Sequence, residues 1–199
     1  MAYPTVSAPY GLRPINLIGG RVFAGSTRLI PITSAEGTSI FYGDVVKLNT
    51  SGTLTKDTGT SAATPVGVFL GCTYTNPSTN QKINAQYFPA GTVAPDIQAY
   101  VCDDNLVLMQ VAVTAAGAST INGVTRAAVG MNTALIQGTG SSTTGDSAVS
   151  VSATTATNAA LPIRIIDVVP ETVNAAGSYT EVIVKWNFGM HQYDNATGV

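Results

Sequence analysis

Alternation between apolar and polar residues is the clearest pattern in this chain, and it predicts β-strands. Residues 179–188 show it best, because Glu181 and Lys185 fall on the face opposite to the apolar side chains of an extended chain. The apolar face of that segment is made of Val182, Val184, Trp186 and Phe188. Residues 161–169 alternate in the same way. We expect these two segments to form paired strands in the core.

Short runs rich in β-branched and aromatic residues recur elsewhere in the chain, separated by Gly, Asn, Ser and Asp. The strands predicted in this way cover residues 21–32, 44–48, 53–56, 65–75, 98–102 and 106–113. Helical spacing occurs only over residues 126–137, where Gly130 and Asn132 weaken it. The predicted fold class is therefore all-β: a β-barrel or sandwich of short antiparallel strands with little helix.

Residues 1–30 differ from the rest and predict an extended N-terminal arm. Prolines and glycines interrupt this segment, and each proline removes an amide donor and favours extended backbone before it. A disordered tail is the alternative, but disordered segments usually lack apolar anchors. The apolar anchors here are Tyr3, Val6, Tyr10, Leu12, Ile15, Leu17 and Ile18. We expect the arm to lie along its own or a neighbouring subunit.

The remaining residues, 31–199, are expected to form a β-rich domain. Within it, residues 138–160 are rich in Ala, Ser, Thr and Gly and contain no aromatic residue. They form either a long exposed loop or weakly patterned strands, and long loops are often functional contacts. Residues 116–160 are therefore a candidate elaboration of the domain or a loop insertion.

The composition favours a protein that works in an assembly. Only 10% of the 199 residues are charged, against about 25% in typical soluble domains. A surface with few charges loses little hydration when another protein covers it, and the centres of protein interfaces are likewise poor in Lys, Glu and Asp. We therefore expect much of the exterior to be suited to contact with other proteins.

Charge and hydropathy also exclude two classes of partner. The net charge is −2, and the nine Lys and Arg residues are dispersed, so no basic patch for nucleic acid is predicted. The longest apolar runs, such as residues 66–70, are too short to cross a bilayer. Residues 1–5 lack the features of a secretory signal. We expect neither a membrane partner nor export from the cytoplasm.

The chain offers little catalytic chemistry. His191 is the only imidazole, and its position near the end of the sequence favours a surface histidine over a general base. The sequence contains no nucleophile elbow, no phosphate-binding loop and no paired-histidine zinc motif. We expect no enzymatic activity, no cofactor and no small-molecule substrate.

Three groups of residues each allow two interpretations. Asp103 and Asp104 could ligate calcium, although Asp-Asp-Asn is also a typical turn sequence. Cys72 and Cys102 either form one disulfide or remain reduced and buried, the commoner state in the cytosol. Aromatic residues such as Tyr87 and Tyr100 either line a sugar-binding surface or pack in cores and interfaces. We expect no metal site and favour packing for the aromatic residues.

Three neighbouring segments, the first two joined by a turn, give the chain a familiar layout. The segments are Gly43-Asp44-Val45-Val46-Lys47-Leu48, Gly52-Thr53-Leu54 and Pro65-Val66-Gly67-Val68-Phe69-Leu70-Gly71. This layout resembles the β-barrel core of lambda-type head decoration (cement, head-stabilising) proteins of tailed phages. A longer likeness is to virion proteins of cyanobacterial and marine phages. It is carried by residues 8–14, 87–92, 99–101, 103–104 and 161–165.

The resemblance implies a structural role with no catalytic residues. Members of this family bind the outer surface of the lattice of major capsid protein, often as homotrimers, and stabilise the expanded head. The resemblance thus implies a protein made in the host cytoplasm and located on the outer capsid surface of the virion. It also implies the major capsid protein as partner, and neither nucleic acid nor membrane.

Extended arms suit such a role, because they can add main-chain hydrogen bonds to a neighbouring sheet. We therefore expect the arm to make the capsid or inter-subunit contacts. The expected contact residues are Tyr3, Pro9, Tyr10, Leu12, Arg13, Pro14, Ile15, Leu17 and Ile18. The alternative function is a virion appendage or a receptor-binding, fibre-like structural protein, with residues 138–160 as its variable tip. A depolymerase is disfavoured, because the acidic residues are mostly isolated.

Overall fold

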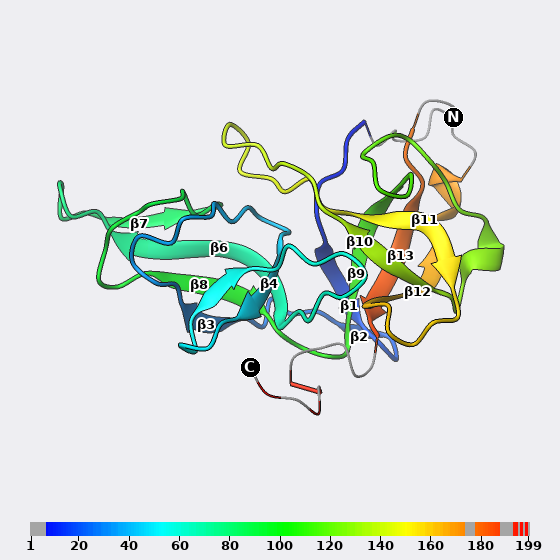
Figure 1. The fold of residues 1–199 in the computed structure, drawn as a ribbon, viewed down its shortest axis with the longest axis horizontal. Helices are drawn as coiled ribbons and strands as arrows, with labels where there is room; N and C mark the ends of the chain where they lie inside the picture. The colour runs from blue at the N-terminus through cyan, green and yellow to red at the C-terminus, as the bar shows by residue number, and fades with distance from the viewer. Residues whose placement is uncertain (1–6, 174–177, 188–192, 195, 197, 199) are drawn as a thin grey trace.

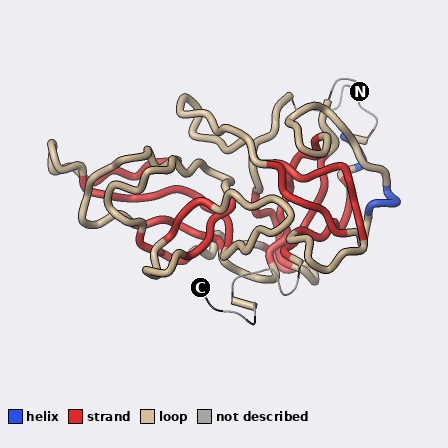
Figure 2. Tube along the Cα trace, in the orientation of Figure 1, coloured by secondary structure: helices blue, strands red, loops and turns tan. Residues whose placement is uncertain are grey.

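The computed structural model describes residues 7–173, 178–187, 193, 194, 196 and 198. Two lobes built from strands lie side by side along the long axis of the molecule (Figure 1). The only described helical segments are two single 3-10 turns, η1 (Arg126–Ala128) and η2 (Pro170–Thr172). Strands and loops make up nearly all of the trace in Figure 2. The predicted all-β fold class, with little helix, is confirmed.

The first lobe, here called the barrel lobe, is a closed five-stranded β-barrel. Its strands are β9 (Val107–Thr114), β10 (Asn132–Ile136), β11 (Ser150–Ala156), β12 (Ile163–Val168) and β13 (Glu181–Trp186). They are hydrogen-bonded in the order β11-β10-β12-β13-β9, and a parallel pairing between β11 and β9 closes the ring. All other pairs in the ring are antiparallel. The predicted β-barrel is therefore present.

Alternation explains the strongest pair of barrel strands. β12 and β13 pair antiparallel from Ile163 opposite Trp186 to Val168 opposite Val182, as the sequence predicts. Their inward side chains are buried together with apolar residues of β9 and β11. Burying a side chain of this size contributes about 1.5–3 kcal/mol relative to an exposed position. The barrel strands thus share one hydrophobic core.

Two N-terminal strands extend the barrel sheet. β1 (Arg13–Leu17) pairs antiparallel with β9, and β2 (Arg21–Val22) pairs with β1 at the open edge. β1 and β11 pair with the same edge of β9. β1 pairs with its first half, and β11 pairs further along, at Val113 and Thr114. The described part of the N-terminal segment is extended, and it lies along its own chain.

The second lobe, here called the sheet lobe, holds the remaining strands. They are β3 (Arg28–Pro31), β4 (Val45–Leu48), β5 (Leu54–Lys56), β6 (Gly67–Thr75), β7 (Lys82–Ala85) and β8 (Gln98–Cys102). The order is β3-β8-β6-β4-β5, with β7 paired to β6, and every pair is antiparallel. A separate core centred on Phe69 and Phe88 lies under this sheet. Residues 31–199 therefore contain two cores.

Three segments distant in sequence meet where the lobes join, a place that we call the junction. Residues 10–12, 42–44 and 145–149 form it. The Leu12 amide donates to Gly43 O at 2.9 Å, and the Gly11 amide donates to Val149 O at 3.1 Å. Backbone hydrogen bonds also run both ways between residues 42 and 145–147. These bonds hold the N-terminal segment against both lobes.

Residues 126–137, the one stretch with helical spacing, do not form an α-helix, in agreement with the little helix expected from the sequence. Only η1 is helical, Gly130 has φ +85°, and Asn132 begins strand β10. As a strand, β10 forms backbone hydrogen bonds with β11 on one side and with β12 on the other. These bonds outweigh a weak preference for helix.

Residues 138–160 were predicted to be either a long exposed loop or weakly patterned strands. The second half of this segment contains strand β11, so the strand alternative holds there, and the rest is a loop.

Candidate interaction surfaces

The predicted contact residues occupy very different environments. Leu12 is fully buried in the barrel core, so its side chain serves this chain and offers no contact to a partner. Arg13 and Ile18 are exposed. Half-buried positions along the barrel are held by Pro9, Tyr10, Pro14, Ile15 and Leu17. Tyr3 lies outside the described residues.

Tyr10 fastens the N-terminal segment to the outside of the barrel. Its hydroxyl donates to Oε1 of Glu181, a buried residue at the start of β13. The guanidinium of Arg13 lies 4.3 Å from the centre of the Tyr10 ring, within the range of a cation–π contact. Burial, followed by the hydrogen bond to the Glu181 carboxylate, raises the pKa of Tyr10 above its usual value. Tyr10 therefore acts as a protonated donor in its own fold.

Glycine at position 11 lets the segment enter the junction. Gly11 has φ +83°, and a Cβ there would lie 2.6 Å from the carbonyl oxygen of Gly43. No side chain fits that space, so the backbones of the two segments can approach only at glycine. The chain thereby brings Leu12 into the core and directs β1 along β9.

Exposed apolar side chains gather at the far end of the same segment. Ile18 is 38% exposed, Val22 of β2 is 76% exposed and Leu106, just before β9, is 40% exposed. The Ile18 amide donates to Leu106 O at 2.9 Å, which places the hairpin of β1 and β2 beside residue 106. We call Ile18, Val22 and Leu106 the hairpin patch. It includes three of the seven large apolar residues that are exposed in the described part of the chain.

A charged group is buried where the lobes join. Asp44 is fully buried and receives hydrogen bonds from Lys56 Nζ, from the Ser147 hydroxyl at 2.6 Å and from the Phe41 amide at 2.9 Å. Lys56 Nζ lies 3.0 Å from Oδ2 and has a side chain only 11% exposed. Oδ1 of Asp44 thus accepts from Lys56 of the sheet lobe and from Ser147 in the loop before β11, and Oδ2 accepts from the Phe41 amide, an arrangement typical of a structural ion pair.

The candidate chemical groups predicted from the sequence play structural parts. Asp103 pairs with Arg28 at 2.9 Å, and Asp104 accepts a hydrogen bond from the Leu106 amide, as expected of a turn. Within the described residues, no group of three His, Cys, Asp or Glu side chains has the geometry of a metal site. His191 lies outside the described residues. The described residues also include no helix able to span a membrane.

Both cysteines are free and buried. Burial raises the pKa of Cys72 to about 12 and that of Cys102 to about 11. The Cys72 thiol lies 3.6 Å from the carbonyl oxygen of Tyr87, to which it donates. A thiol that stays protonated at neutral pH is a poor nucleophile, so neither cysteine has the environment of a reactive one.

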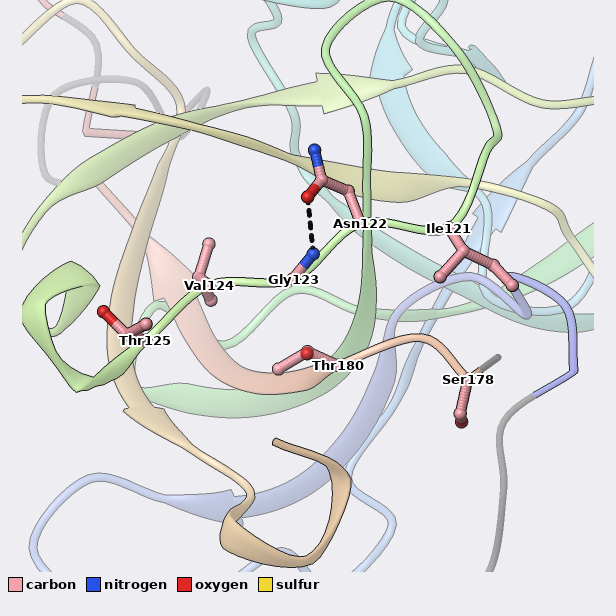
Figure 3. Close-up of a pocket in the computed structure, with 7 residues that line it drawn as sticks. All are labelled: Ile121, Asn122, Gly123, Val124, Thr125, Ser178 and Thr180. Atoms are coloured by element: carbon pink, nitrogen blue, oxygen red, sulfur yellow. Dashed lines mark hydrogen bonds between the residues drawn. The ribbon is translucent and has the colours of Figure 1, made fainter. Parts of the chain in front are cut away.

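One hollow of about 300 Å³ lies beside the start of β13 (Figure 3). Its described lining consists of Ile121, Asn122, Gly123, Val124, Thr125, Ser178 and Thr180. The Asn122 side chain accepts a hydrogen bond at 2.8 Å from the Gly123 amide, as the dashed line in Figure 3 marks. The described lining contains no group that titrates near neutral pH, so it supplies no acid or base for a reaction.

A larger groove of about 450 Å³ lies on the sheet lobe. Tyr100 of β8 and Tyr42 both line it, whereas the ring of Tyr87 stacks on Phe41 with centroids 5.4 Å apart. Of the two tyrosines singled out from the sequence, one therefore faces a groove and the other packs. Sequence reasoning missed Tyr42, because nothing local relates it to a residue 58 positions away.

Comparison of this sequence with protein-family models, with curated proteins and with solved structures finds no match.

Proposed function

We propose that this chain is a phage capsid decoration protein that binds the outer surface of the major capsid protein lattice and stabilises the expanded head. Its resemblance to lambda-type decoration proteins and its sparsely charged composition motivate the proposal. The single observation that carries it is the hairpin patch. There, Ile18, Val22 and Leu106 lie exposed on the element formed by the N-terminal segment and β9.

The hairpin patch suits contact with a large, repetitive partner. β2 ends the barrel sheet, so its outer edge has free backbone donors and acceptors among the described strands, and such an edge can pair with a strand of another protein. Apolar side chains next to that edge add burial to the main-chain hydrogen bonds. Repeated over a lattice, or presented three at a time by a homotrimer, weak contacts of this kind give strong attachment through effective concentration.

Point substitutions test the proposal better than removal of residues 1–30. Such a deletion would take Leu12 and Ile30 out of the two cores and would unfold the protein. Ile18→Asp and Val22→Asp instead place charges on exposed positions. Val93→Asp is the matched control, because Val93 is 60% exposed in the sheet lobe, away from the hairpin patch.

The measurement is co-sedimentation with expanded heads, free of decoration protein, of the virus that encodes the chain. We expect the unchanged protein and Val93→Asp to bind equally, and each hairpin-patch variant to bind about tenfold more weakly. Unchanged binding by both hairpin-patch variants would remove the patch from the proposal. Failure of the unchanged protein to bind would overturn the proposed function itself.

A virion appendage or receptor-binding protein is the second candidate function, and the groove on the sheet lobe favours it. Two tyrosines line this groove, and none of its described lining residues is charged. The number of copies in purified particles separates the two candidates. A decoration protein is present in numbers comparable to the capsid protein, whereas an appendage is present in a few copies.

A further inference from the structure

The groove on the sheet lobe lies over strands β6, β7 and β8, which run side by side in Figure 1. Its lining consists of Tyr42, Leu70, Gly71, Cys72, Asn84, Ala85, Gln86 and Tyr100. Its volume of about 450 Å³ lies within the range of about 300–1,000 Å³ found for ligand sites. The groove therefore has the size of a site for a small ligand.

A β-bulge shapes this groove. Phe69 pairs with Val101 and Cys72 pairs with Ala99, so two residues of β6, Leu70 and Gly71, stand opposite the single residue Tyr100 of β8. Bulges of this kind redirect side chains and are frequent next to binding sites. Because its neighbours in β8 point into the core, Tyr100 points outward and is half-buried.

Glycine at the bulge brings β7 close to one wall of the groove. Gly71 has φ +130°, and a Cβ there would lie 2.9 Å from the carbonyl oxygen of Ala85. The residues on either side of Ala85 are exposed and line the groove: Asn84 in β7 and Gln86 just after its end. The Gln86 amide nitrogen donates to Asp146 at 3.0 Å, which fixes the side chain at the rim.

The groups in the groove are neutral hydrogen-bonding groups combined with aromatic rings. The described lining contains two tyrosines and two carboxamides but no Asp, Glu, Lys or Arg. Among the described residues, the hydroxyls of Tyr42 and Tyr100 and the side-chain amide of Asn84 have no hydrogen-bond partner. Carboxamides both donate and accept, as the hydroxyls of a sugar do, and aromatic faces pack against the C–H faces of a pyranose ring.

We propose that this groove binds a neutral oligosaccharide. Tyr42 and Tyr100 provide ring faces and hydroxyls, and Asn84 and Gln86 provide amide contacts to sugar hydroxyls. An acidic sugar is disfavoured, because the described lining of the groove contains no cation. The groove lies on the sheet lobe next to the junction and shares no residue with the hairpin patch, so the proposed site goes beyond attachment to a capsid.

The experiment titrates the purified full-length chain with maltotetraose, cellotetraose, a mannotetraose and an N-acetylglucosamine tetramer, with a heparin-derived tetrasaccharide as the acidic probe. Binding is followed by NMR chemical shifts and by calorimetry. We expect at least one neutral probe to bind with a Kd below about 1 mM and the acidic probe not to bind. The shifted amides should belong to β6, β7 and β8.

Variants locate the site. Tyr100→Ala and Tyr42→Ala should each weaken binding about tenfold, because each removes one ring contact and one hydroxyl. Tyr193→Ala is the matched control, since Tyr193 is 45% exposed and does not line the groove, and it should bind as the unchanged protein does.

Several outcomes would overturn the proposal: no binding of any neutral probe, preference for the acidic probe, or equal weakening by Tyr193→Ala. A variant that loses its dispersed NMR spectrum has unfolded. Asn84→Asp, an exposed change, then tests the groove instead and should also weaken binding. None of these results depends on capsid attachment, so the two proposals fail separately.

Discussion

Single buried polar residues determine how the two lobes are held together. Asp44 is the clearest, because its carboxylate is satisfied by Lys56 from the sheet lobe and Ser147 from the loop before β11. Removing one partner of a buried pair leaves the other charge without compensation, whereas an exposed pair contributes little. We therefore expect an Asp→Ala substitution to reduce stability far more in a buried ion pair than in an exposed one.

Asp44→Ala should lower the free energy of unfolding by about 3–5 kcal/mol, because it leaves the ammonium of Lys56 buried and unpaired. Asp167→Ala is the control: Asp167 pairs with Arg126, and both side chains are well exposed. Its loss should be below about 1 kcal/mol. Urea unfolding of both variants measures the contrast, and equal losses would contradict a structural role for Asp44.

Tyr10→Phe removes the hydroxyl that donates to Glu181. We expect a loss of about 1–3 kcal/mol near neutral pH, since a buried carboxylate then lacks a donor. The pKa of Tyr10 is raised in the fold, so its contribution is complete below the unfolded tyrosine pKa of about 10 and is lost as pH rises towards the folded value.

Urea unfolding of Tyr10→Phe and of the unchanged protein, at neutral pH and at about pH 11, tests this dependence. The difference in stability between the two proteins should shrink at the higher pH. A difference that grows with pH would show that the Tyr10 hydroxyl is not held protonated by the fold.

At the scale of elements, the path of the N-terminal segment depends on glycine. Gly11 and Gly19 have the same φ, +83°, but a Cβ at position 11 would meet Gly43 O at 2.6 Å, whereas nothing lies within 4 Å of one at position 19. The two positions thus separate the conformational cost of a positive φ from the steric cost of the junction.

Both Gly11→Ala and Gly19→Ala should lose about 1–2 kcal/mol for the left-handed backbone. Gly11→Ala should lose about 1–3 kcal/mol more, because its methyl group cannot fit beside Gly43. Thermal and urea unfolding give both values. Similar losses in the two variants would mean that the segment does not enter the junction as described.

Some strands could be predicted from the sequence and others could not, because their buried residues differ in polarity. β12 and β13 alternate clearly, and their inward residues are large and apolar. In β10 and β11 the buried positions include Thr133 and Ser150, which look like solvent-facing residues in a sequence. Thr133 Oγ1 donates to Ser152 O at 2.6 Å, and Ser150 lies 2.8 Å from Thr114 Oγ1. Hydrogen bonds that only the closed barrel provides make these polar residues acceptable inside.

The candidate surfaces could likewise be predicted only in part from the sequence. Ile18 could be singled out because it is an apolar residue of the predicted arm, but Val22 and Leu106 join it only through the pairing of β1 with β9. Tyr42 and Tyr100 likewise share a groove because of a bulge in β6, for which the sequence gives no local signal beyond Gly71. Pairing between distant strands is what sequence patterns leave unspecified.

At the scale of the whole molecule, the two strand-built lobes are joined by the hydrogen bond from Ser147 to the buried Asp44 and by an N-terminal segment that contacts both. The hairpin patch lies beside β2 on the barrel lobe, and the groove lies over β6, β7 and β8 on the sheet lobe. Figure 1 shows these strands in the two different lobes. A protein arranged in this way can attach through one lobe and present the other. Substitutions in one surface should therefore leave binding at the other unchanged, which calorimetry with oligosaccharide and co-sedimentation with heads can measure on the same variants.

The most direct test of the proposed function is the number of chains that bind to expanded heads at saturation. We expect saturable binding at a fixed ratio to the major capsid protein, with heads that resist heating better once the sites are filled. Absence of saturable binding to expanded heads, or full binding with no gain in heat resistance, would contradict the proposed function.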